Sequence, residues 1–153
     1  MADARRWVRA EGKRPITPTG TPSSSTNPST WYSFAEVQQG AGDGYGVMLG
    51  GGLGCYDLDS ALEDGAVKPW ARDVIDSIEE PIVYVEKSVS GRGLHVFVQL
   101  PEQRGTRRSA GDGSVEKYSY GRFIRCGEPA NLKEVMSNAR STTKEERPAT
   151  PSQ

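Results

Sequence analysis

Three carboxylates in the middle of the chain have the type and spacing needed to bind divalent cations, and a histidine stands near them in the sequence pattern. Asp57 and Asp59 are two residues apart in the apolar run CYDLD, so on a strand both side chains project from the same side. Glu116 in SVEKY and His95 in LHVFVQL stand in two further apolar runs. If the three strands are neighbours, the carboxylates and the imidazole converge on one face of a sheet.

Carboxylates this close together repel each other unless a cation lies between them. Mg²⁺ and Mn²⁺ prefer carboxylate oxygens and leave positions open for water and phosphate. A pair of such ions activates a hydroxyl group and stabilises a leaving pyrophosphate oxygen. The pattern therefore predicts a catalytic Mg²⁺ or Mn²⁺ site at Asp57, Asp59 and Glu116. The alternative interpretation is that the two aspartates end a strand in a solvated loop.

The segment SVSGRGLH offers a phosphate site next to the histidine. Gly91 and Gly93 let the backbone approach a ligand, and successive N–H groups can form an anion-binding nest. Ser90 and Arg92 add donors for phosphate oxygens. His95, the only histidine of the chain, would donate to a bound phosphate. Gly-Arg-Gly serves a simple hairpin turn equally well, and a lone histidine in an apolar strand is more often a core residue.

Short apolar runs predict the strands that carry these residues. They cover 45–49, 53–59, 82–88, 94–100, 114–118 and 122–126. The glycine run between the first two predicts a tight hairpin. A clear helix is predicted in 67–80 and a weaker one in 131–139. The fold class is α+β, a mostly antiparallel sheet with helices on one face.

The length of 153 residues supports a single domain, expected over 1–139. Segment 15–30 is rich in Pro, Ser and Thr and predicts an ordered irregular loop. It leads into a short helix that Ser33 and Glu36 begin with a capping box. Residues 140–153 have almost nothing to bury and are expected to be disordered.

Charge and cysteine content restrict the classes of function. Nineteen basic and twenty acidic residues give no overall attraction to nucleic acid, so local clusters must make such contacts. The candidate contacts to a nucleic-acid strand are Lys13, Arg14, Arg104, Arg107 and Arg108. Two cysteines and one histidine exclude a disulfide framework and a four-ligand zinc site. Without a signal segment or a membrane-length apolar run, the expectation is a cytoplasmic protein with no membrane partner.

Three motifs, CYDLD, VEKSVSGRGLHVFV and VEKYSYGRFIRCG, resemble in this order the catalytic motifs of the archaeo-eukaryotic primase superfamily. The nearer match is to the bifunctional primase-polymerase (prim-pol) domains of phages and plasmids. The lead-in KRPITPTGTPSSSTNPSTWYSF is similar to that of the same domains, so the resemblance covers roughly residues 7–129. It implies an RRM-like core with an N-terminal α/β portion packed beside it.

The resemblance also implies roles for residues. Asp57, Asp59 and Glu116 match the metal ligands, and His95 matches a histidine that contacts the phosphates of the incoming nucleotide. Arg122 would reach the triphosphate beside Ser90 and Arg92. The loop glycines Gly91 and Gly93 would belong to the same nucleotide-binding site. The implied activity is metal-dependent, template-directed nucleotidyl transfer in phage or plasmid DNA replication, in the cytoplasm of a bacterial host. Its partners would be nucleoside triphosphates, single-stranded template and primer, and a separate replicative helicase.

The sequence departs from these relatives after the third motif. They often carry a Thr-x-Thr-Gly element there, whereas this chain has RCGEP. Arg125 would then substitute as a phosphate or template contact, or the nucleotide pocket is altered. The alternative function is a non-catalytic module that binds single-stranded nucleic acid or a replisome protein. A replication-initiator nuclease is disfavoured because it normally needs two metal-binding histidines.

Overall fold

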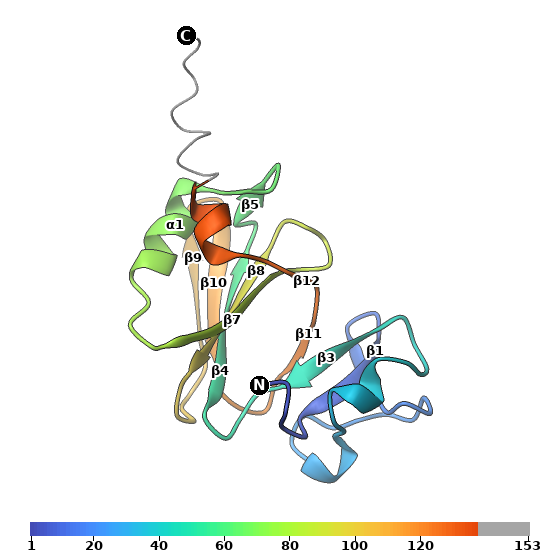
Figure 1. Ribbon diagram of the computed structural model, residues 1–153. Helices are drawn as coiled ribbons and strands as arrows, with labels where there is room; N and C mark the ends of the chain where they lie inside the picture. The colour runs from blue at the N-terminus through green and yellow to red at the C-terminus, as the bar shows by residue number, and fades with distance from the viewer. Residues whose placement is uncertain (138–153) are drawn as a thin grey trace, which may run out of the picture.

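The computed structural model describes residues 1–137, which form six-, four- and two-stranded sheets (Figure 1). Every strand pair in the six-stranded sheet is antiparallel, in the order β12-β7-β8-β4-β10-β9. In that order the strands are β12 (Glu128–Pro129), β7 (Ile82–Lys87), β8 (Leu94–Gln99), β4 (Leu53–Asp59), β10 (Gly113–Tyr118) and β9 (Thr106–Ala110). This larger sheet carries most of the residues singled out from the sequence.

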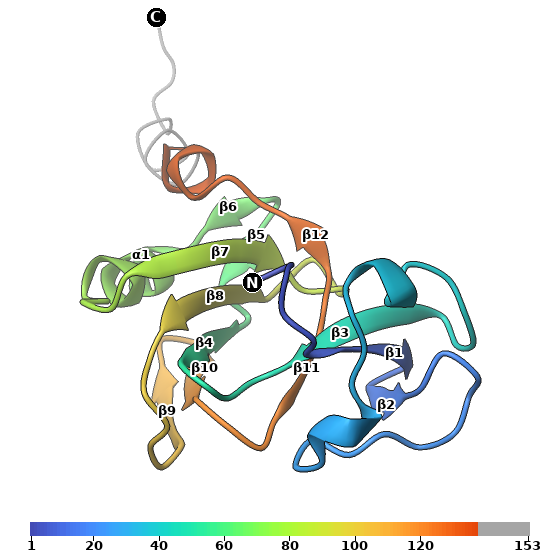
Figure 2. The ribbon, with the colours of Figure 1, turned by 60° about the horizontal axis from the view of Figure 1, so that its bottom comes forward.

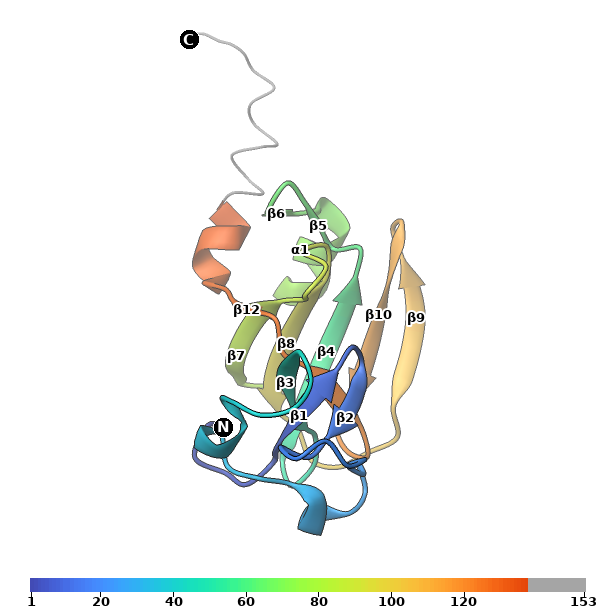
Figure 3. The same ribbon diagram turned by 90° about the vertical axis from the view of Figure 1, so that its right-hand side faces the viewer.

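The smaller sheet has the order β11-β3-β1-β2 and is also antiparallel. Its strands are β11 (Phe123–Arg125), β3 (Gly44–Met48), β1 (Trp7–Glu11) and β2 (Arg14–Ile16). Figures 1 and 3 show it against one face of the larger sheet, near one end. A separate hairpin pairs β5 (Leu62–Glu63) with β6 (Ala66–Val67).

The helices cover the opposite face of the larger sheet, as the sequence predicted. Helix α1 (Pro69–Asp76) begins with Pro69 in its first turn and buries Val74 and Ile75. Residues 132–137 are also helical, and Val135 joins the same buried cluster as α1. The α+β class and the placement of helices on one face are therefore confirmed. Among the helices of residues 1–137, none is long and apolar enough to cross a membrane.

The glycine run at 50–52 does not form the predicted hairpin, because β3 and β4 belong to different sheets. The turn itself is tight: Gly50 and Leu53 exchange backbone hydrogen bonds of 3.1 and 3.2 Å. Gly51 and Gly52 have φ values of 62° and 101°, a region that favours glycine. The run thus reverses the chain as it passes from the smaller sheet to the larger one (Figure 2).

The N-terminal portion contains strands and 3-10 turns but no α-helix before α1, which corrects the α/β expectation. The capping box does form, since Ser33 N–H donates to Glu36 and Glu36 N–H donates to Ser33. It supports only one 3-10 turn, η2 (Ala35–Val37), because glycine-rich chain follows. Another turn, η1 (Pro28–Thr30), lies within the ordered loop that the sequence predicted over 15–30. The tail predicted over 140–153 lies outside the described residues.

The face of the larger sheet that lacks helices is divided into an apolar and a polar half. Cys55 and Phe97 are completely buried in the apolar half, packed with Trp7 and Val47 of the smaller sheet. Two residues further along β4, and two back along β8, the same face carries Asp57 and His95. The smaller sheet therefore covers one half and leaves the other half available to solutes.

We expect Phe97→Ala to lower the free energy of unfolding by about 3–5 kcal/mol, because its ring fills the space between the two sheets. Denaturant unfolding measures the change, and Phe97→Leu should give a smaller loss in the same direction. Val89, which is 64% exposed, provides the control: Val89→Ala should change stability by no more than about 0.5 kcal/mol. Equal stability of the Phe97 and Val89 variants would contradict the packing described.

Candidate functional site

The register of the larger sheet places its charged residues side by side. Glu116 on β10 is opposite Asp57 on β4, and Asp57 is opposite His95 on β8. Directly opposite residues on one face have Cβ atoms about 4.5–5.5 Å apart. Two aspartates, a glutamate and a histidine therefore share one polar half-face, as the alternation of the sequence predicted.

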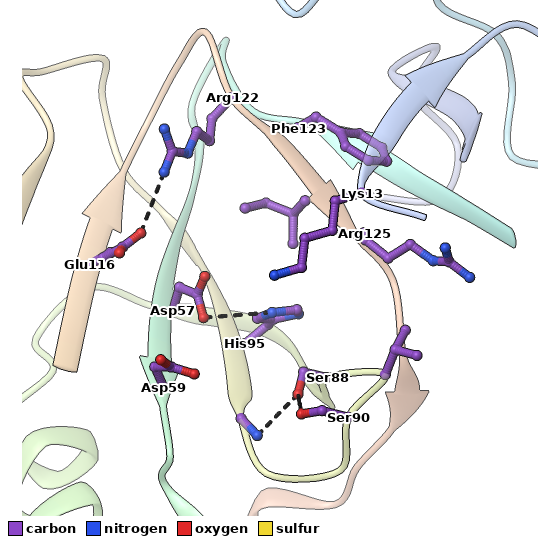
Figure 4. Close-up of a pocket in the computed structure, with 13 residues that line it drawn as sticks. Lys13, Asp57, Asp59, Ser88, Ser90, His95, Glu116, Arg122, Phe123 and Arg125 are labelled. Atoms are coloured by element: carbon purple, nitrogen blue, oxygen red, sulfur yellow. Dashed lines mark hydrogen bonds and ion pairs between the residues drawn. The ribbon is translucent and has the colours of Figure 1, made fainter. Parts of the chain in front are cut away.

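A pocket of about 440 Å³ opens above this half-face (Figure 4). Its floor is formed by β4, β8 and β10, which carry the charged residues. Its opposite wall is formed by β11 and the β1–β2 turn. The residues that line it are Lys13, Asp57, Asp59, Ser88, Val89, Ser90, Gly93, His95, Glu116, Arg122, Phe123, Ile124 and Arg125. The volume lies within the range of about 300–1,000 Å³ that is usual for small-molecule sites.

Asp57 is the pocket carboxylate whose pKa its surroundings raise. Burial raises its pKa above the ordinary value, the His95 ring opposes that rise, and the nearby charges of Glu116 and Asp59 add to it. Its Oδ1 lies 3.6 Å from Nε2 of His95. The pocket floor thus concentrates negative charge that is costly to hold without a nearby cation.

Glu116 is turned toward two arginines. Its carboxylate lies 3.4 Å from Arg107 on β9 and 3.4 Å from Arg122, which precedes β11. Arg122 also stacks on the ring of Tyr118, with the guanidinium carbon 3.9 Å from the ring centroid. Arg122 therefore lies at the pocket edge, where its guanidinium contacts both the carboxylate of Glu116 and the ring of Tyr118.

The donor set of the pocket fits a hard divalent cation, although the side chains are not gathered around one point. Within residues 1–137, no three His, Cys, Asp or Glu side chains are close enough together to hold a metal ion as they stand. Asp57 and Asp59 line the same pocket from one strand and supply the oxygen ligands that Mg²⁺ and Mn²⁺ prefer. Burial is the main cause that raises the pKa of Asp57, and the repulsion from Glu116 and Asp59 that adds to it is what a bound cation would relieve.

The loop between β7 and β8 is a hairpin turn in which the N–H groups of Gly91, Arg92 and Gly93 are already bonded. Gly91 N–H donates to the Ser88 carbonyl, and Gly93 N–H donates to the Ser88 hydroxyl. Arg92 N–H donates to the Ser90 hydroxyl. The predicted anion-binding nest is therefore not open in this conformation, because the serines satisfy its donors. Ser90 and Gly93 line the pocket, whereas Gly91 and Arg92 do not.

Lys13 reaches the pocket from the β1–β2 turn, and Figure 4 shows its amine directed toward Asp57 and His95. Arg125 holds this turn from below: its guanidinium donates to the Gly12 carbonyl at 2.6 Å and to Asp43 at 2.7 Å. Arg125 therefore anchors the turn that presents Lys13 and also lines the pocket, and its expected contact to phosphate or template stays a prediction.

The other basic residues expected to contact nucleic acid do not form one patch. Arg107 is opposite Glu116 and shares the pocket face, whereas Arg108 is opposite Val115 and lies on the other face of β9. Arg14 pairs with Glu11 at the surface, away from the pocket lining. Arg104 is exposed in the loop before β9. Only Lys13 among the five candidates lines the pocket.

Glu86 was not singled out from the sequence, yet it completes the charged row. It is opposite His95 in the β7–β8 register, is fully buried, and lies 2.8 Å from Nδ1 of the ring. The signal was only partial: a hairpin with the six-residue loop SVSGRG, 88–93, pairs Glu86 with His95, whereas one centred on SGRG alone would pair Glu86 with Phe97. Ser88, which organises the turn, was missed in the same way.

Comparison with known proteins adds no family. No family model matches the chain, and no curated protein has a significant sequence match to it. The proposed function therefore rests on the residues of the site and their geometry.

We expect Asp57→Asn to raise the free energy of unfolding at pH 7 in a chelator. The pKa of Asp57 is higher in the folded than in the unfolded chain, so ionising it costs stability as pH rises through that interval. The gain should disappear below the ordinary aspartate value of 3.8, where the side chain is protonated in both states. Denaturant unfolding between pH 3 and 8 measures this. Asp3, whose side chain is 97% exposed, is the matched control as Asp3→Asn.

A wild-type protein more stable than Asp57→Asn at pH 7, under the same metal-free conditions, would contradict the charge balance described for the pocket floor.

Proposed function

We propose that the chain is a metal-dependent nucleotidyltransferase of the primase-polymerase type, with the RRM-like core that its motifs imply. The observation that supports this best is the alignment of Glu116, Asp57 and His95 across three adjacent strands, beneath a pocket edged by Lys13 and Arg122. An acidic floor and a basic wall suit a ligand that combines divalent cations with phosphates. A nucleoside triphosphate with Mg²⁺ or Mn²⁺ is such a ligand.

In this proposal Asp57 and Asp59 hold the cation, and Glu116 joins them once its arginines turn to phosphate. When bound, the metal would neutralise charge as a primer hydroxyl attacks the α-phosphate in line and the bond to the leaving pyrophosphate breaks. His95 and Ser90 contact phosphate oxygens from the floor and the turn, and Lys13 and Arg122 contact them from the opposite wall. These residues act by positioning and charge, which is the main protein contribution to phosphoryl-type transfers.

The conformation of Glu116 favours one second candidate, a module that binds nucleic acid without catalysis. Two arginines lie 3.4 Å from the third carboxylate, and within residues 1–137 no three carboxylate, histidine or cysteine side chains are grouped to hold a metal ion. Such a module would bind a single strand through its basic residues without needing a divalent ion. Metal dependence separates the two functions.

We expect Mn²⁺-dependent extension of a primed DNA template, and we expect Asp57→Asn and Asp59→Asn each to lower its rate about 1,000-fold. Loss of a metal ligand removes several kcal/mol of charge stabilisation in the transition state. Labelled primer extension with dNTPs or rNTPs measures the rate, with Asp3→Asn as the active control.

Full activity in either aspartate variant would contradict the assignment of the metal ligands. Wild-type protein that incorporates no nucleotide, and binds single-stranded DNA equally well in Mn²⁺ and in EDTA, would favour the binding module instead.

A further inference from the structure

Glu86 is the most deeply buried charged side chain next to the pocket, yet it does not line the pocket. It lies on β7 with no solvent exposure, behind the ring of His95. Its Oε2 is 2.8 Å from Nδ1 of His95, and the thiol of Cys126 is a second polar group in contact with the carboxylate. A carboxylate buried in this way needs a specific partner, because burying an unpaired charge costs several kcal/mol.

The surroundings of Glu86 show that His95 is that partner. Burial raises the pKa of the Cys126 thiol and raises the pKa of Tyr84 to about 12, and the charge of Glu86 is the next cause in both cases. Both groups therefore stay neutral beside it. Among the described residues, His95 is the one ion-pair partner of Glu86.

The ring of His95 is consequently held from behind. Nδ1 faces Glu86, so the opposite nitrogen, Nε2, faces the pocket at 3.6 Å from Oδ1 of Asp57 (Figure 4). The edge of Phe97 packs next to the ring, with centroids 6.3 Å apart. A side chain that is only 9% exposed and held in this way has little freedom to flip.

We propose that Glu86 is a positioning residue: by accepting the Nδ1–H of His95 it fixes the ring so that, with both nitrogens protonated, Nε2–H is the donor a bound phosphate meets. The inference rests on the proposed function for the phosphate, but the orientation of the ring stands on the structure alone. The same arrangement, a carboxylate behind a functional imidazole, orients many histidines that bind metals.

Because the chain has one histidine, long-range ¹H–¹⁵N spectra report on this ring without overlap. We expect a protonated, hydrogen-bonded Nδ1 in the wild type and in Glu86→Gln, whose carbonyl oxygen still accepts, and loss of that signal in Glu86→Leu. Titration with inorganic triphosphate and Mg²⁺ should shift Nε2 rather than Nδ1. An unprotonated Nδ1 in the wild type, or an unchanged Nδ1–H signal in Glu86→Leu, would overturn the proposal.

Nucleotide kinetics provide the second readout. Glu86→Leu should raise the KM for the nucleotide by about 10- to 100-fold with a smaller change in kcat, and Glu86→Gln should recover much of it. Glu128, exposed on the neighbouring strand β12, gives the matched control Glu128→Gln, which should behave as the wild type.

A Glu86→Leu protein that is less stable but keeps the wild-type KM has lost only a structural contact, and that result would also overturn the proposal. If the wild type neither incorporates nucleotide nor binds triphosphate, the proposed function fails, while the Nδ1–H signal still decides whether Glu86 positions the ring.

Discussion

Antiparallel pairing of three strands is the constraint on which the site depends. A strand alternates its side chains between two faces, and a shift of one residue would send Asp57 or His95 to the helix-covered face. The apolar residues between them prevent that shift: Leu58, Val96 and Val115 are buried under the helices. The same packing that stabilises the sheet therefore holds ionisable groups in one row, where their charges interact strongly.

Interactions within that row differ in strength because burial differs along it. Glu86 has no exposure, His95 has 9%, and Asp57 has 34% of its side chain exposed. Toward β9 the row reaches solvent at Arg107, which is 67% exposed. Charged groups at the buried end have few other polar partners within reach, so their contacts are held firmly. Those at the exposed end can exchange their partners for water and salt ions. Glu116, between Asp57 and Arg107, is 21% exposed, so the contrast is between the two ends of the row: the β7 end is fixed and the β9 end is adjustable.

Much of this arrangement could be predicted from the sequence, because alternation in a strand is a local property. The shared face of Asp57, Asp59, His95 and Glu116 follows from parity once the strands are neighbours. What could not be predicted depends on contacts distant in the chain. The engagement of Arg125 by Asp43 and Gly12 joins segments 82 and 113 residues apart. The prediction of a hairpin at the glycine run was wrong for the same reason. Local sequence signals indicate a turn but do not say which sheet each flanking strand joins.

The two walls of the pocket belong to different sheets. The acidic floor lies on β4, β8 and β10, which belong to the larger sheet. Lys13 and Arg122 come from the side of the smaller sheet, so the pocket lies between the two sheets. Any solute that bridges acid and base across this pocket also fastens the sheets to each other. Ligand binding and the packing of the two sheets are then coupled by mass action. The free energy needed to separate the smaller sheet from the larger one rises with ligand concentration.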